Sequence, residues 1–220
     1  MSEAPVGAGR WAARKAPHKP NLDWTSQRAS YRRFWQHLLM PPVTRPLDVT
    51  DAVALTALYA ENRQFLAPWQ PLRPDSYFTE AGQREAVEAA LAQKASGSAV
   101  PLAVLDRDGS VAGTLTVASI IRGAFQSCSV GYWLAERAQG QGLATAALRE
   151  AADLAFGHLR LHRIQAETLS HNVRSQRVLQ RVGFEQYGAA RSYMHIAGEW
   201  QDNVLYQLLT PTPERVVTYR

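Results

Sequence analysis

Between residues 43 and 210, stretches in which every second residue is apolar alternate with stretches in which apolar residues recur every three or four positions. The first spacing predicts strands and the second predicts helices. Strands are expected at residues 43–48, 99–105, 111–121, 127–134, 162–169, 184–196 and 199–209. Helices are expected at residues 51–61, 79–95 and 172–182, with one more beginning at about residue 142. We therefore predict an α/β (α+β) sandwich, in which helices flank a mostly antiparallel, twisted sheet.

Turn and capping residues mark the ends of several of these elements. The pair Asp108-Gly109 is a strong turn signal and closes a hairpin between two of the expected strands. Asn172 is a good N-cap, and Gly183 suits the left-handed position that follows the last helical residue. Asn172 and Gly183 are thus explained by local structure, without any ligand.

The loop from Arg137 to Gly142 lies between an expected strand and a long amphipathic helix. Gly140 and Gly142 allow the backbone to approach a ligand closely, and the amides that open the helix would point at it. Such a loop favours an anion, in particular a pyrophosphate; the alternative is an ordinary turn. The glycine spacing fits neither a Rossmann dinucleotide loop nor a P-loop.

This loop resembles a family signature. Arg137, Gly140 and Gly142 match the Arg/Gln-x-x-Gly-x-Gly/Ala motif of the GCN5-related N-acetyltransferases (GNAT), which grips the pyrophosphate of acetyl-CoA. A second block, Asn172-x-x-Ser175 followed by Gly183-Phe184, resembles the segment after the fifth strand of that family. The resemblance covers residues 43 to 210 and implies the GNAT acyl-CoA N-acyltransferase fold.

Further segments resemble the RimJ/RimL type within this family, which acetylates ribosomal proteins. They are Val130–Leu134 leading into Gln139–Gly142, Arg191-x-Tyr193, Gly198-x-Trp200-x-Asp202, and Asn62 through Pro68-Trp69. The resemblance implies acetyl-CoA as cosubstrate. The residues that it assigns to the cofactor are Tyr132, Trp133, Leu134, Arg137, Gln139, Gly140, Gln141, Gly142, Ala144, Thr145, Asn172 and Ser175.

The implied reaction is direct acetyl transfer to an amine, without a covalent acetyl-enzyme. A backbone amide near Trp133 or Leu134 would stabilise the developing oxyanion. The family pattern places Ser175 to give the thiolate leaving group a proton or a hydrogen bond. Both groups are therefore candidates for the chemistry itself.

The general base is less well defined by the sequence. Glu167 is the leading candidate because it shares the polar face of its strand with Arg163 and Gln165; the alternative is a solvated surface carboxylate. Further candidates are Tyr132, His171 and Tyr193, each more often a packing or capping residue. Cys128 lies on an apolar face and is not expected to be a nucleophile.

The expected acceptor is a protein N-terminal α-amino group, as in a ribosomal protein. An α-amino group with a pKa of about 7.7–8.0 is far easier to deprotonate than a lysine at about 10.4. Two alternatives remain open. One is acetylation of a small amine such as an antibiotic, polyamine or amino acid, and the other is a non-catalytic acyl-CoA-binding sensor.

Length and composition agree with one domain at residues 43–210, an N-terminal extension at 1–42 and a tail at 211–220. The chain has 220 residues, 46% of them hydrophobic, and a single cysteine, so neither a disulfide framework nor a metal site is expected. No run of about 18 apolar residues and no signal-peptide pattern occurs, so no membrane partner and a cytoplasmic location are expected.

The N-terminal extension holds seven basic and two acidic residues, and it accounts for the whole net charge of +5. We expect a disordered leader followed by a short helix at about residues 25–39 that packs on the domain. The alternative is an arm for ribosomal RNA or an acidic partner, although direct nucleic-acid binding is not favoured. The apolar final strand with Val204-Leu205-Tyr206 would suit a homodimer.

Overall fold

The structure is a computed structural model, and it describes residues 42–210. A seven-stranded sheet forms its centre. The expected helix at 25–39 and the tail at 211–220 lie outside the described residues. The strands are β1 (Thr44–Pro46), β2 (Val100–Leu105), β3 (Val111–Ile121), β4 (Ser127–Leu134), β5 (Arg163–Leu169), β6 (Glu185–Ile196) and β7 (Glu199–Leu209). Their order across the sheet is β1-β2-β3-β4-β5-β7-β6; β4 and β5 pair in parallel, and the other neighbours pair antiparallel. The predicted fold class is confirmed.

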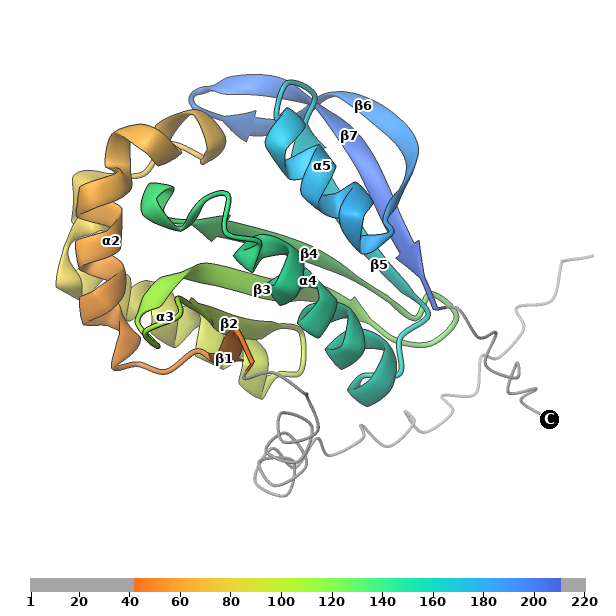
Figure 1. Ribbon diagram of the computed structural model, residues 1–220, viewed down its shortest axis with the longest axis horizontal. Helices are drawn as coiled ribbons and strands as arrows, with labels where there is room; N and C mark the ends of the chain where they lie inside the picture. Colours follow the sequence, from red (N-terminus) through yellow and green to blue (C-terminus); the bar gives the residue numbers. More distant parts are fainter. Residues whose placement is uncertain (1–41, 211–220) are drawn as a thin grey trace, which may run out of the picture.

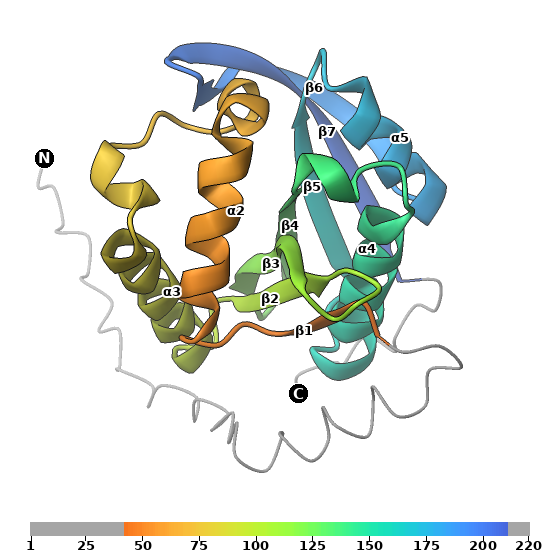
Figure 2. The same ribbon diagram turned by 60° about the vertical axis from the view of Figure 1, so that its left-hand side comes forward.

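Helices cover both faces of this sheet (Figures 1 and 2). The α-helices are α2 (Asp51–Leu66), α3 (Glu80–Ala95), α4 (Leu143–Asp153) and α5 (Val173–Val182). Short 3-10 helices are η1 (Ala67–Trp69), η2 (Asp75–Phe78) and η3 (Glu136–Ala138), and a π-helical turn, η4 (Leu154–His158), follows α4. Figure 2 shows α2 and α3 on one side of the sheet and α4 and α5 on the other.

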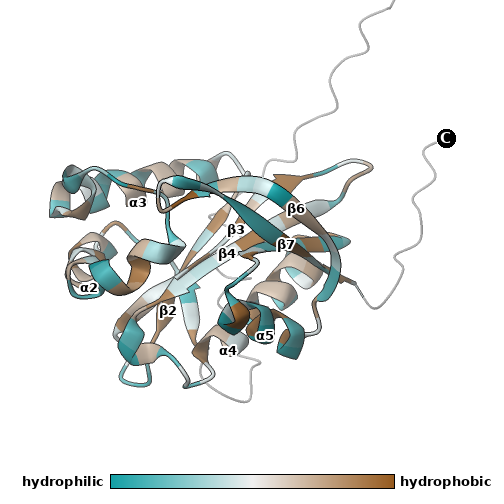
Figure 3. Cartoon of the chain, turned by 90° about the horizontal axis from the view of Figure 1, so that it is seen from above, coloured by the Kyte–Doolittle hydropathy of each residue, from teal (hydrophilic) through white to brown (hydrophobic). Residues whose placement is uncertain are grey.

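Two apolar cores separate along these faces. The larger core joins α4 and α5 to the sheet, with Leu148 and Leu179 at 1% exposure. The smaller core joins α2 and α3 to β2 and β3 through residues such as Leu55, Leu58 and Val87. Each helix carries both apolar and polar segments in Figure 3, as expected for helices with one face on a sheet.

Helix α2 is longer than its sequence pattern indicated, ending at Leu66 instead of 61. The extra turn continues the buried face through Asn62 and Leu66, each 5% exposed. Asn62 is polar and therefore interrupts the apolar period, yet its Nδ2 donates to the Leu58 carbonyl at 2.8 Å inside the helix. The Glu136 amide also donates to Asn62 Oδ1 at 2.7 Å, and this tertiary contact allows the helix to continue past the end of the apolar pattern.

Strand β7 is internal to the sheet, between β5 and β6. Tyr206 is 1% exposed and Val204 packs against the same core. Tyr206 is therefore engaged inside the domain and Val204 is partly buried there, so these two residues offer little surface for the expected dimer.

The short edge strand β1 is attached to α4 by one buried carboxylate. Glu150, 8% exposed, accepts hydrogen bonds from the amides of Val43 and Thr44 at 2.8 and 3.0 Å, and from the Thr44 hydroxyl at 2.7 Å. Burial raises the pKa of Glu150, and the bonds from Thr44 and Val43 oppose that shift. The contact joins residues more than 100 positions apart in the chain.

We expect Glu150→Gln to destabilise the fold. An amide nitrogen cannot accept a hydrogen bond, so at least one donor of β1 would lose its partner, at a cost of about 1–3 kcal/mol. Urea unfolding measures this loss. The control is Glu88→Gln on the exposed face of α3, where a change within about 0.5 kcal/mol is expected. Equal losses in both variants would contradict the structural role of Glu150.

Candidate active site

Strands β4 and β5 part in the middle of the sheet. They pair only where Ser127, Cys128 and Ser129 meet Arg163, Ile164 and Gln165. Beyond that point β4 remains paired with β3 and β5 remains paired with β7, but not with each other. A gap therefore opens in the sheet between Val130–Leu134 and Ala166–Leu169.

Two cavities meet at this gap. The first, of about 560 Å³, lies towards α4 and α5 and is called the α5-side cavity. The second, of about 520 Å³, lies towards α2 and the β6–β7 hairpin and is called the α2-side cavity. Both are lined by Leu66, Trp69, Tyr132, Trp133, Asn172 and Ser175. A molecule on one side can therefore reach a molecule on the other between these residues.

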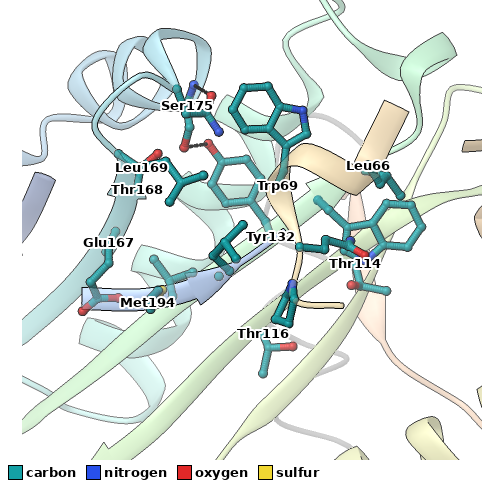
Figure 4. Close-up of a pocket in the computed structure, with 18 of the residues that line it drawn as sticks. Leu66, Trp69, Thr114, Thr116, Tyr132, Glu167, Thr168, Leu169, Ser175 and Met194 are labelled. Atoms are coloured by element: carbon teal, nitrogen blue, oxygen red, sulfur yellow. Dashed lines mark hydrogen bonds between the residues drawn. The ribbon is translucent and has the colours of Figure 1, made fainter. Parts of the chain in front are cut away.

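The hydroxyls of Tyr132 and Ser175 meet where the cavities join. They lie 3.1 Å apart, and Figure 4 shows them turned towards each other. Asn172 caps α5 as predicted, because its Oδ1 accepts from the Ser175 amide at 3.1 Å. Burial raises the pKa of Tyr132, so its phenol stays protonated and able to donate.

Helix α4 begins beside the α5-side cavity and has no side-chain cap at its N-terminus. Gly142 occupies its N-cap position, and the bond from Ala146 N to Gly142 O is 3.0 Å. The amides of residues 143 to 145 thus lack an intrahelical acceptor. Gly140 and Gly142 have φ of +74° and +81°, and a Cβ on either would meet no atom within 4 Å. This open, amide-rich surface suits a phosphate group.

Side chains of the loop hold its shape. Arg137 pairs with Asp106 in the β2–β3 turn at 2.9 Å, so its guanidinium contacts protein. Gln139 donates to the Leu134 carbonyl at 3.1 Å, and Gln141 donates to the Arg137 carbonyl at 2.9 Å. These contacts fix the loop before any ligand arrives.

Alternation along β4 determines which amides face the gap. The Ala135 amide donates to Ala112 O in β3 at 2.8 Å, and Trp133 lies opposite Thr114 in the same ladder. Odd-numbered amides therefore turn towards β3, and those of Tyr132 and Leu134 turn towards the gap. Of the two amides considered for the oxyanion, Leu134 has the suitable direction and Trp133 does not.

The α2-side cavity has aromatic walls. The Trp133 ring lies on this face, 4.6 Å from Tyr59 of α2, and Tyr59 packs edge-on against Tyr77 at 5.4 Å. Thr114 and Thr116 of β3 and Met194 of β6 complete much of the lining. The cavity thus combines a wall of aromatic rings with polar side chains on the sheet, a lining that suits an amine attached to a larger molecule.

Two polar side chains in this cavity bear on its chemistry. Glu167 lines it, and burial raises the pKa of this carboxyl. Asn203 lines it too; the residue is 2% exposed, and its Oδ1 has no hydrogen-bond partner among the described residues. An orphaned buried acceptor suits a ligand N–H donor.

The β6–β7 hairpin extends across to the segment after α2 (Figure 1). At its turn, the Ala197 amide donates to the Gln70 carbonyl at 3.0 Å, and Gly198 lies against Leu72. Met194 and Ile196 of the hairpin line the α2-side cavity. The hairpin therefore forms one wall of that cavity and is fixed at its far end.

Most of the residues predicted for the cofactor converge on one side. Those that line the α5-side cavity are Tyr132, Trp133, Leu134, Gln139, Ala144, Asn172 and Ser175. Those that adjoin it in the loop and first helical turn are Arg137, Gly140, Gln141, Gly142 and Thr145. Trp133 lines both cavities, and its ring lies on the α2 side.

Other candidates are separated from the site or packed at its edge. Cys128 is 2% exposed, lines neither cavity, and burial raises the pKa of its thiol to about 12. His171 stacks on Trp69 at 5.5 Å. Among residues 42–210, no three His, Cys, Asp or Glu side chains are grouped so as to hold a metal ion. Within the same range, no helix is long and apolar enough to cross a membrane.

Sequence reasoning missed most of the α2-side cavity. Trp69 lines both cavities, although it was noted only within a resembling segment. Asn62 from that segment has a structural role: its Oδ1 accepts from the Glu136 amide at 2.7 Å and so positions the start of the loop. Thr114, Thr116 and Asn203 carry no local signal, since only strand pairing brings them together.

Comparison with known proteins agrees with this geometry. Residues 43–185 match the acetyltransferase (GNAT) domain model. The chain therefore belongs to the GNAT family of N-acetyltransferases, which confirms the family that the motifs indicated.

Within the family, the chain is similar to RimJ-type ribosomal-protein acetyltransferases. It is 37% identical over 176 residues to the [Ribosomal protein uS5]-alanine N-acetyltransferase of Escherichia coli (strain K12), covering 79% of this chain and 91% of the relative. The ribosomal-protein-S5-alanine acetyltransferase from Vibrio fischeri superposes with a TM-score of 0.72, at 31% identity over 77% of this chain and 94% of that one.

Mycobacterium smegmatis RimJ, solved with CoA-disulfide, gives a TM-score of 0.73 at 30% identity, over 76% of this chain and 81% of that one. GNAT enzymes use acetyl-CoA, and the α5-side features fit it. The uncapped helix and the two open glycines suit a pyrophosphate, and the cavity beside them leads to Ser175 at the gap.

We expect Gly140→Ala to weaken acetyl-CoA binding by about tenfold or more. A Cβ would occupy the space where the ligand approaches, and overpacking by about 1–3 kcal/mol corresponds to such a factor. Calorimetric titration with acetyl-CoA measures it.

The matched control is Gly123→Ala in the β3–β4 loop. Gly123 has φ of +72° and open space around its Cβ position, so both variants share a backbone cost of about 1–2 kcal/mol. The control should bind acetyl-CoA normally. Unchanged affinity in Gly140→Ala, or equal losses in both, would contradict our assignment of the loop.

Proposed function

We propose that this chain transfers the acetyl group of acetyl-CoA to the N-terminal α-amino group of a protein, with a ribosomal protein as the expected acceptor in the cytoplasm. The observation that carries this proposal is that the α2-side cavity is open to solvent, with Trp69 and Met194 of its lining each 37% exposed. An acceptor can enter with its amine first and leave the rest of its chain outside. Similarity to uS5-alanine N-acetyltransferases supports the same acceptor class.

In the proposed reaction, Glu167 takes the proton that the acceptor amine must lose, directly or through water. Burial raises the pKa of this carboxyl, which makes its ionised form a stronger base. Its placement in the cavity suits an α-amino group, whose ordinary pKa of about 7.7–8.0 lies close to the working pH. The orphaned Asn203 Oδ1 would accept a hydrogen bond from the incoming N-terminus.

Bound acetyl-CoA supplies a thioester whose carbonyl the neutral amine attacks. The Leu134 amide, turned into the gap, donates to the carbonyl oxygen as it gains negative charge. Ser175, hydrogen-bonded to the protonated Tyr132, donates to the sulfur as the carbon–sulfur bond breaks. The nitrogen forms the amide bond and loses its second proton, which replaces the proton that Ser175 gives to the sulfur, so CoA leaves as a thiol and Ser175 is restored.

We expect Glu167→Gln to lower kcat by about 10²–10⁴-fold, the usual contribution of a general base. Glu167 must be ionised to act as a base, so wild-type kcat/KM should fall as the pH drops through the raised pKa of Glu167. The Glu167→Gln variant should lose this acid limb of the pH profile. Steady-state rates from pH 5 to 9 measure the loss in kcat and the pH profile, and the Kd for acetyl-CoA shows whether cofactor binding is unchanged. A normal kcat in Glu167→Gln would remove Glu167 from the reaction.

The acceptor class is tested by release of free CoA from acetyl-CoA. We expect turnover with peptides that have a free N-terminus and none with the same peptides blocked, since the amine is the nucleophile. Mass spectrometry of the product should locate the acetyl group on the α-nitrogen. Turnover with small amines alone would indicate the metabolic alternative, and tight acetyl-CoA binding without turnover would indicate a sensor.

A further inference from the structure

One face of the sheet beyond the active site carries a row of polar side chains. On β5, Ile164 and Ala166 point into the larger core, so Arg163, Gln165 and Glu167 share the opposite face. Their partners on β7 are Leu209, Gln207 and Leu205, which lie on the same face because directly paired residues do. We call Glu167, Gln165 and Arg163 the β5 row.

Two tyrosines of β6 lie beside this row. Tyr187 accepts a hydrogen bond from Gln165 Nε2 at 2.8 Å, and the Arg163 guanidinium lies over its ring at 4.9 Å. The pKa of Tyr193 is raised, first by burial and then by the nearby charges of Glu167 and Tyr187, so Tyr193 lies within electrostatic range of both. Tyr187 and Tyr193 are 40% and 44% exposed, so the row adjoins an open aromatic surface.

The row leads outward from the active site and changes its hydrogen-bonding character on the way. At the inner end, Glu167 and the orphaned Asn203 Oδ1 are acceptors. At the outer end, Arg163 is a donor whose buried Nε has no partner, and among residues 42–210 no carboxylate forms an ion pair with it. This polarity suits a ligand with N–H groups at its inner end and a negative charge farther out.

Strand geometry sets the distance between the two ends. Glu167 and Arg163 are four positions apart on β5, which is about 13 Å at 3.3 Å per residue. An extended peptide covers the same distance in as many residues. With its amine at Glu167, its fourth or fifth side chain would lie near Arg163.

We propose that Arg163, on the Tyr187 ring, is a second recognition site that binds an acidic side chain at the fourth or fifth position of the acceptor peptide. This inference rests on the proposed function, since it requires a peptide acceptor. The planar guanidinium supported by an aromatic ring presents a donor fork that matches a carboxylate.

The test uses octapeptides with a free N-terminus and a single Glu, Gln or Lys placed at position 3, 4, 5 or 6. For the full-length wild-type chain, kcat/KM should be about fivefold higher with Glu than with Gln at position 4 or 5, the factor that corresponds to about 1 kcal/mol. R163Q should abolish this preference while leaving the Kd for acetyl-CoA unchanged. R163E should prefer Lys at the same position.

The control is R149Q, which removes an exposed arginine from α4 on the opposite side of the sheet and should keep the preference for Glu. R163E combined with the Lys peptide reverses both charges. This combination separates direct recognition from a structural role of Arg163, because a damaged fold would not gain activity with the Lys peptide. If the wild type acetylates all peptides equally, or R163Q keeps the preference, the inference is wrong and the proposed function stands. If no peptide is acetylated, both fail.

Discussion

The separation of β4 from β5 is the constraint on which the rest of the structure depends. A sheet interior normally pairs every backbone amide and carbonyl, because an unpaired buried group is costly. Here the pairing ends at Ser129 and Gln165, and the amides of Tyr132 and Leu134 turn into the gap. The unpaired amides are then available to a ligand. The same break joins the two cavities, so it creates both the donor and the passage.

Contacts on both sides of the sheet keep the strands apart. On one side, α5 holds Tyr132 through Ser175, and Asn172 fixes Ser175 by capping the helix. On the other side, the Trp133 ring packs against Tyr59 of α2. Successive residues of β4 are thus held by different layers, and neither layer alone would position the strand. Because the supports are packed side chains, the gap is preorganised before substrate binds.

The sequence predicted the residues around the α5-side cavity far better than those around the α2-side cavity, and the reason is physical. Gly140, Gly142, Asn172 and Gly183 have backbone requirements that are local, so a short motif records them. The opposite cavity assembles Trp69, Thr114, Met194 and Asn203 from segments far apart in the chain. No local rule marks such residues, because each is an ordinary strand or helix residue until pairing brings it to the cavity. The end of α2 was misjudged for the same reason, since Asn62 is buried by a contact with Glu136.

This difference in locality also separates the two halves of the function. The features assigned to the cofactor are a loop and two helix starts, which all lie between β4 and the first turn of α5. The cavity proposed for the acceptor is bounded by α2, η1 and the β6–β7 hairpin, and the Ala197–Gln70 bond joins the hairpin to the residue after η1. Changes in these outer segments can reshape the acceptor cavity without disturbing the uncapped start of α4 or the gap. A fold built in this way keeps acetyl-CoA chemistry constant while the acceptor varies, which is why the family is readable from short motifs and the acceptor must be read from the surface beside Glu167.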